Sequence, residues 1–374
     1  MGSSSHMEVG EILNYLLHNH SRWLASGPDS HIVISSRVRL ARNLSDFPFP
    51  NRADQNQLLT IREKLFDALG RVKGLSDHWV IDMDKLDQID RQFLVERHLI
   101  SYEHTVEGVG KGLVITPDEG VSIMINEEDH LRMQVLVAGF DLYKAWEQMD
   151  AIDDSLSQLV EFAFSPDFGY LTACPTNTGT GLRGSLMMHL PALVMTKQIN
   201  RVLQTITQLN FTARGLYGEG TQALGNMFQI SNQACLGYSE EELLEGITRL
   251  GGQIVDQEQN ARERVLRNSR VMLEDRIWRA YGLLKNARIM NSAEAFEYLS
   301  MVRLGLDLGL IKDVDLKLIN DLFIIIQPAH LQKISGRRLS SRQRDIKRAK
   351  ILRVRLGCEE TSSSSTDKEG TDNV

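Results

Sequence analysis

Arginines beside predicted strands and turns are the residues of this 374-residue chain best suited to bind an anion. Arg37 and Arg39 stand two apart in SSRVR, so on a strand both side chains lie on one face. Arg132 follows NEEDH, Arg183 lies in GTGLRG, and Arg214 precedes a glycine-rich turn. A guanidinium stays charged and matches two phosphate oxygens at once. Each one alone is more often surface charge, but the five together indicate an anion site.

Residues 167–184, DFGYLTACPTNTGTGLRG, contain two well-known signatures, and neither one holds. Asp-Phe-Gly binds magnesium in protein kinases together with His-Arg-Asp and Ala-Pro-Glu, and both are absent here. We therefore predict a plain turn at 167–169. GTGLRG lacks the acid about 20 residues later that a dinucleotide site needs, because the next acid is Glu219. What survives is a Gly/Thr-rich loop whose N–H groups suit phosphate oxygens.

Carboxylates and a thiol supply the remaining candidates for chemistry. The acids of NEED are consecutive: Glu127, Glu128 and Asp129. They are either carboxylates that take part in the chemistry or simply the charged end of a hairpin. Cys174 lies just before the Gly/Thr-rich loop. It is either a reactive thiol at the site or a small buried residue that acts as a hydrophobic side chain.

Hydrophobic periodicity predicts the elements that must position these side chains. Alternation in HIVISSRVRLAR predicts a strand over 31–42, and two β-branched runs around Pro117–Gly120 predict a hairpin. Two later segments, FTARGLYGEG and NMFQISNQ, read as strands, while 56–69 and 142–164 read as helices. From Ser239, a serine followed by three glutamates, the pattern is helical almost to Leu356.

The same patterns divide the chain into four parts. We expect a tag remnant at 1–7, a mixed α/β part at 8–262, an all-helical part at 263–356 and a disordered, serine-rich tail at 357–374. No apolar run is long enough to span a membrane and no signal peptide is visible. Three scattered cysteines are too few for a disulfide framework or a zinc site, so a reducing cytoplasm is the simplest setting.

Charge is distributed unevenly along the chain. The net charge of −7 argues against wholesale nucleic-acid binding. Residues 333–355 nevertheless hold ten Lys/Arg and one acid, Asp345. Such a stretch is either a solvated helix face or a ligand site.

Several separated motifs resemble one family, the ATP:guanido phosphotransferases. CPTNTGT (174–180), SSRVR (35–39), NEEDHLR (126–132), the arginine of GLRGS and RG-x-x-GEG (214–220) follow that family's order. YLTACPTNTGTGLRGSLMMHLPAL and GEGTQALGNMFQISNQ are most similar to the bacterial protein arginine kinases within it. The resemblance covers about 28–356. Two departures are Thr178, where the family has an aliphatic residue, and the loop at 102–112.

The resemblance implies an α+β fold, an antiparallel sheet flanked by helices, followed by an all-α C-terminal domain. It implies that ATP phosphates, bridged by Mg²⁺, are held by five arginines: Arg37, Arg39, Arg132, Arg183 and Arg214. Glu128 becomes the general base, Glu219 a second carboxylate on the substrate guanidinium, and Cys174 a thiol beside it whose pKa nearby arginines lower. A carboxylate is far too weak to deprotonate a guanidinium beforehand, so proton transfer must accompany the attack.

The resemblance also implies substrates and partners. Small-guanidine kinases carry a helical domain of about a hundred residues before SSRVR, whereas only some 30 residues precede Ser35 here, so the expected substrate is arginine within proteins. Arg344, Asp345 and Arg348 resemble an RD-x-x-RA motif that binds phosphoarginine allosterically. A homodimer, an activator of the McsA type, delivery to a Clp ATPase/protease and a role in bacterial stress response are further expectations. The alternatives are a small-molecule guanidine kinase and a catalytically silent adaptor.

Overall fold

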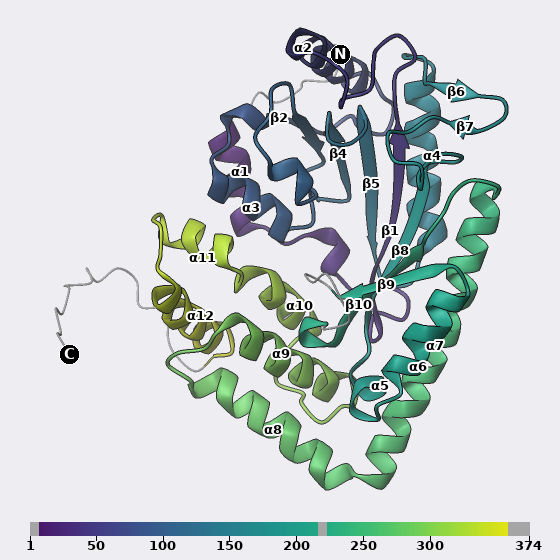
Figure 1. Cartoon of the computed structure of the whole chain (residues 1–374). Helices are drawn as coiled ribbons and strands as arrows, with labels where there is room; N and C mark the ends of the chain where they lie inside the picture. Colours follow the sequence, from purple (N-terminus) through teal and green to yellow (C-terminus); the bar gives the residue numbers. More distant parts are fainter. Residues whose placement is uncertain (1–6, 216–222, 358–374) are drawn as a thin grey trace.

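The computed structural model describes residues 7–215 and 223–357. Ten strands and twelve α-helices lie within these ranges (Figure 1). The strands are β1 (Val33–Arg42), β2 (Trp79–Asp82), β3 (Gly112–Ile115), β4 (Val121–Ile125), β5 (Leu131–Ala138), β6 (Phe164–Ser165), β7 (Gly169–Tyr170), β8 (Leu182–His189), β9 (Phe211–Gly215) and β10 (Met227–Asn232). The helices up to α6 are α1 (Val9–His18), α2 (Gln55–Leu69), α3 (Gln88–Glu96), α4 (Leu142–Ser157), α5 (Pro191–Met195) and α6 (Ile199–Gln208). The remaining helices are α7 (Glu240–Asn268), α8 (Arg270–Asn286), α9 (Ser292–Asp307), α10 (Leu316–Ile325), α11 (Pro328–Ser335) and α12 (Ser341–Arg355).

Eight strands form one sheet in the order β2-β3-β4-β5-β1-β8-β10-β9, and every pairing in it is antiparallel. The predicted hairpin forms as β3 and β4, which pair from Gly112–Ile125 to Ile115–Ser122. The antiparallel sheet with flanking helices and the helical C-terminal part confirm the predicted fold class.

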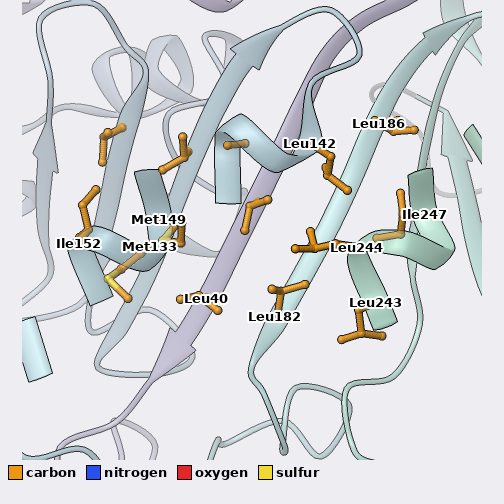
Figure 2. Packing of buried hydrophobic residues seen from close by; sticks show 14 of the residues in the cluster. Leu40, Met133, Leu142, Met149, Ile152, Leu182, Leu186, Leu243, Leu244 and Ile247 are labelled. Atoms are coloured by element: carbon orange, nitrogen blue, oxygen red, sulfur yellow. The ribbon is translucent and has the colours of Figure 1, made fainter. Parts of the chain in front are cut away.

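One face of the sheet is apolar and is covered by α4 and α7 (Figure 2). Leu40, Met133 and Leu182 point from β1, β5 and β8 toward Met149 of α4 and Leu244 of α7 (Figure 2). Burying this face is the main stabilising contribution to the sheet, because apolar area removed from water gives about 25 cal/mol per Å². The packed helices therefore leave the opposite face of the same strands available for polar side chains.

The helical C-terminal part begins inside a continuous helix. Ser239 caps α7 and its hydroxyl accepts a hydrogen bond from the amide of Glu242, as the sequence predicted. Since α7 runs from Glu240 to Asn268, it passes through the expected domain boundary at 262/263 without a break. Helices α8, α9, α10 and α12 enclose a second core below the sheet (Figure 1).

Two local expectations can be compared with the structure around residue 165. Asp167-Phe168-Gly169 forms the predicted turn, between β6 and β7, with Gly169 at φ +74°. The helix predicted over 142–164 is wrong beyond Ser157. Phe162 there pairs with Leu44 as a β-bridge, and Phe164 pairs with Tyr170 of β7, so strand contacts outweigh the helical periodicity. Within the described residues, no helix has the length and apolar character needed to cross a membrane. The expected disordered tail lies, from residue 358 on, outside these residues.

Candidate functional site

Sheet register places all five candidate arginines on one face. Arg39 of β1 is opposite Arg183 of β8, and Arg132 of β5 is opposite Ala41, two residues beyond Arg39. Opposed residues of an antiparallel pair share a face, as do residues two apart. Arg214 of β9 pairs with Gln229, which in turn pairs with Met187 of β8. Met187 is four residues from Arg183, an even number, so Arg214 lies on the same face as Arg183. This face is the one opposite the apolar core.

Neutral groups hold two of these guanidinium groups, those of Arg37 and Arg183, in place. Arg37 donates from Nη2 to Gln229 Oε1 at 2.9 Å and from Nε to the Ser185 hydroxyl at 3.3 Å. Arg183 donates to the Ser231 hydroxyl at 3.3 Å. The Nε of Arg39 is buried and has no hydrogen-bond partner among the described residues. Arg132 alone among the five has a carboxylate partner within the described residues, Glu127.

The result is a concentration of positive charge in which, among the described residues, only Arg132 is paired with an acid. Burial, and then repulsion from Arg132 and Arg183, lowers the pKa of Arg37 to about 10. Burial and the neighbouring arginines likewise lower the pKa of Arg39 and Arg183. Placing like charges close together costs free energy unless an opposite charge compensates. Such a cluster of arginines therefore indicates a site where an anion binds. The five predicted arginines thus share one face in an arrangement compatible with a polyphosphate, and their role in binding it stays a prediction.

The NEED segment is the turn between β4 and β5 and begins with a strained residue. Asn126 has φ +54°, a left-handed conformation that asparagine tolerates better than most residues. Glu127 then turns inward and accepts hydrogen bonds from Arg132 at 2.8 Å and from the Ser101 hydroxyl at 2.6 Å. Although its burial opposes ionisation, the Arg132 charge lowers the pKa of Glu127. Glu127 therefore orients Arg132 in this structure.

Glu128 has a different environment from its neighbour. Its side chain is exposed and lines a groove together with Ala173, the residue before Cys174. The pKa of Glu128 is raised, chiefly by partial desolvation. The charge of Arg132 opposes this shift, whereas repulsion from Asp129, Glu127 and Glu103 adds to it. A carboxylate whose pKa is raised is a better proton acceptor once ionised. Of the three acids in NEED, Glu128 alone is free to meet a ligand.

Asp129 ties the cysteine-bearing loop to this turn. Its Oδ1 accepts hydrogen bonds from the Ala173 amide at 2.7 Å and from Asn43 Nδ2 at 2.6 Å. Cys174 is half-buried, with its thiol 3.0 Å from the Thr176 hydroxyl. Cys235, in contrast, is buried against the Leu182 carbonyl, and burial raises its pKa. The alternative of a fully buried Cys174 is thus not what the structure shows.

An apolar cavity beside Arg37 is a feature that the sequence reasoning missed. It lies between the arginine face of the sheet and the helical part, with a lining that includes Trp23, His98, Met187 and Phe323. The Trp23 Nε1 is buried there and has no hydrogen-bond partner among the described residues. Burial, and then the charge of Arg37, lowers the pKa of His98 to about 3, so this imidazole is neutral. These residues come from four distant segments, and no local motif marks them.

The basic motif lies on α12, in the helical part. Arg348 is buried and donates to the carbonyl oxygens of Ile326 and Met290, each at 2.9 Å, and to Asp345 at 2.6 Å. Arg344 is half-buried and donates from Nη1 to the Leu339 carbonyl at 2.9 Å. Arg348 thus anchors α12 to the end of α10, whereas Arg344 and Asp345 lie closer to solvent. Glu219, the expected second carboxylate on the guanidinium, lies outside the described residues.

Comparison with known proteins assigns a class to this fold and site. Residues 60–261 match the family model of the ATP:guanido phosphotransferase C-terminal catalytic domain, and residues 270–367 match that of the protein-arginine kinase McsB C-terminal domain. The chain therefore belongs to the ATP:guanido phosphotransferase family. Three of the five arginines, Arg132, Arg183 and Arg214, and the carboxylate turn lie within the first of these matches, whereas Arg37 and Arg39 of β1 precede it.

Among individual relatives are proteins named protein-arginine kinase. The one from Halothermothrix orenii is 46% identical over 351 residues, which cover 94% of this chain and 99% of the relative. The one from Bacillus subtilis strain 168 is 44% identical over 351 residues, 93% of this chain and 96% of the relative.

Solved structures agree on the fold. A lombricine kinase is 25% identical with a TM-score of 0.55, covering 63% of this chain and 69% of its own. A duplicated taurocyamine kinase from Schistosoma mansoni, with bound transition-state-analogue components, is 24% identical with a TM-score of 0.57 and covers 63% of this chain and 34% of its own.

Proposed function

We propose that this chain is a protein-arginine kinase, transferring the γ-phosphoryl group of ATP to an arginine side chain of a protein. The observation that carries the proposal is the face of five arginines, four of them without a carboxylate partner among the described residues, beside the exposed Glu128. Phosphoryl transfer needs positioning and charge neutralisation above all. The family membership and the names of the relatives support the guanidine as acceptor.

The arginines act on the nucleotide. Arg37, Arg39, Arg132, Arg183 and Arg214 bind the phosphate oxygens, and their charges stabilise the negative charge that develops on the transferring group. Within the described residues, no group of three His, Cys, Asp or Glu is arranged to hold a metal. Mg²⁺, bound together with the nucleotide, would supply further charge neutralisation at this site.

Glu128 acts on the guanidinium. As the arginine nitrogen forms its bond to the γ-phosphorus, the bond to the β–γ bridging oxygen breaks and ADP leaves with that electron pair. The nitrogen loses a proton to Glu128 in the same step, because free deprotonation at neutral pH is too rare. Glu219 holds the guanidinium from another side, and Cys174, on a loop fixed by Asp129, lies next to it.

Partners and regulation are proposed on the same basis. Val271, Met272 and Trp278 leave an exposed apolar face on α8, which supports a homodimer through the helical part. Arg344 and Asp345 on α12, with Arg348 as their anchor, bind phosphoarginine as an allosteric signal. The match to the McsB C-terminal domain supports a wider proposal: an McsA-type activator, delivery of marked proteins to a Clp ATPase/protease, a cytoplasmic location and a stress-response role.

One assay separates the candidate functions. The protein is given ATP and Mg²⁺ with a protein substrate or with free arginine, and acid-labile P–N phosphate is measured. Phosphorylation of the protein supports the proposal. Phosphorylation of free arginine alone supports a small-guanidine kinase. Nucleotide binding with no phosphate transfer to either substrate supports a silent adaptor.

A further inference from the structure

A groove adjoins the carboxylate turn, and none of the five arginines lines it. Its solvent-filled volume is about 400 Å³, within the range typical of ligand sites. Glu128 lies in its wall, Pro50 and Leu58 line it on one side, and Gly108, Val109 and Lys111 line it on the other. The second wall is the 102–112 loop, the segment with no counterpart in the family motifs.

One side chain fixes both walls of this groove. Asn126 donates from Nδ2 to the Leu58 carbonyl at 2.9 Å and to the Gly110 carbonyl at 2.8 Å. Gly110 has φ +78°, and a Cβ at this residue would lie 2.8 Å from the Leu58 carbonyl carbon, so the two walls meet closely there. Lys111 donates to the carbonyl oxygens of Glu103 and Val106 at 3.2 and 2.9 Å, which closes the loop on itself. The groove is therefore preformed.

The same asparagine also carries an unused acceptor. Asn126 is 3% exposed and lines the groove, and its Oδ1 is buried without a hydrogen-bond partner among the described residues. Buried polar atoms are nearly always paired, so an unpaired one beside a groove points to a ligand donor. A main-chain N–H of an extended peptide is a donor of the right kind. Pro50, Leu58 and Val109 supply apolar surface for the adjacent side chains.

We propose that this groove binds the polypeptide segment flanking the target arginine, in an extended conformation, with that arginine entering at Glu128. The inference rests on the proposed function and specifies its substrate as peptide rather than isolated guanidine. Val109 in the groove wall is 36% exposed. A free guanidine bound at Glu128 would leave this side chain uncovered. A bound flank covers it. At the end of the groove, the exposed Glu128 carboxylate complements the positive charge of the arginine.

The test compares two substrates of the same chemistry. One is N-acetyl-arginine amide, and the other is a nine-residue alanine-rich peptide with a central arginine. For the unaltered protein we expect kcat/KM for the peptide to exceed that for the blocked arginine by about tenfold or more. Val109→Asp places a charge in the groove and should reduce this ratio roughly fivefold or more. Val106→Asp is the matched control, because Val106 is on the same loop, 63% exposed and outside the groove lining.

The outcomes separate the groove from the function on which it rests. Peptide binding is measured in parallel by fluorescence anisotropy of the labelled peptide, and thermal melting confirms that both variants are folded. A reduced ratio and weakened binding in Val109→Asp, but not in Val106→Asp, support the proposal. Equal ratios in both variants, or no preference of the unaltered protein for the peptide, overturn the groove and leave the kinase assignment standing. Phosphorylation of neither substrate contradicts the proposed function itself.

Discussion

Arg39 of β1 and Arg183 of β8 are direct partners across an antiparallel strand pair, two cations on one face of the sheet. Neither has a carboxylate partner among the described residues, and burial and neighbouring arginines lower the pKa of both. The folded, nucleotide-free protein therefore carries a repulsion that bound phosphate relieves. Such conflicts between stability and activity are common at active sites.

Replacing Arg183 by glutamine should separate these two effects. Removing one cation relieves repulsion, so the nucleotide-free protein should melt at an equal or higher temperature. Removing a phosphate ligand should lower kcat by about 10²- to 10³-fold. Thermal melting and steady-state kinetics measure the two quantities. Arg249→Gln is the control, because Arg249 is exposed on α7 and pairs only with Glu245 among the described residues. A variant that loses both stability and activity would argue against the repulsion.

The pH dependence of activity should report the Glu128 carboxylate. Because desolvation and nearby acids raise the pKa of Glu128, the acid limb of kcat/KM should lie above the usual glutamate value of about 4.3. Asp129→Asn keeps the oxygen that accepts from Ala173 and Asn43 but removes a repelling charge. The limb should then move to lower pH. A limb that stays in place would show that another group controls it.

Cys174 should be the more reactive of the two cysteines that the structure describes. Its thiol is half-buried, whereas Cys235 is 2% exposed and donates to the Leu182 carbonyl. Iodoacetamide labelling followed by peptide mass spectrometry should modify Cys174 first, and ATP should change its rate because the arginine face is adjacent. In the Cys174→Ser variant, loss of the modified peptide confirms that it carries Cys174. Equally slow labelling of Cys174 and Cys235, at a rate that ATP does not change, would refute the prediction.

Stability should depend on pH through Glu96, which joins α3 to the helical part. Its carboxylate accepts hydrogen bonds from the amides of Ala329 and His330 and from His330 Nδ1, at 2.8 to 3.0 Å. Burial raises its pKa to about 7, with the amide hydrogen bonds opposing. The folded state therefore holds this proton more tightly than the unfolded state. The resulting stabilisation is complete below the unfolded pKa of about 4.5 and is lost as pH rises through about 7.

Glu96→Gln removes this titration. Between pH 5 and pH 8 the unaltered protein should lose up to about 3 kcal/mol of unfolding free energy relative to the variant. Urea unfolding of both proteins at the two pH values measures the difference, and other titrating groups cancel in the comparison. A difference that does not change with pH would exclude Glu96 as the titrating group.

The sequence predicted the strands and their common face well because alternation is a local signal. Arg37 and Arg39, two apart on a strand, needed only the period of the backbone. The position of Arg183 opposite Arg39 depends on pairing between segments more than 140 residues apart, and the sequence did not predict it; the motif resemblance implied only that both arginines bind the ATP phosphates. The helix predicted to continue to Phe164 failed because the bridge of Phe162 to Leu44 is nonlocal.

Parts of the site had no signal in the sequence at all. Glu127 and Glu128 are adjacent and chemically identical, yet one turns inward to Arg132 and the other faces the groove. The cavity beside Arg37 collects Trp23, Met187 and Phe323 from segments that only tertiary packing brings together. Packing of this kind overrides local pattern, so neither feature could be read before the fold was known.

The central claim is that Glu128 accepts the proton of an arginine held against ATP on the arginine face. The most direct measurement is phosphoarginine formation by Glu128→Gln, with nucleotide affinity measured on the same sample. We expect the rate of transfer to fall by about 10²- to 10⁴-fold while nucleotide affinity stays within about twofold, since the arginines are untouched. Transfer at the unaltered rate would contradict the account.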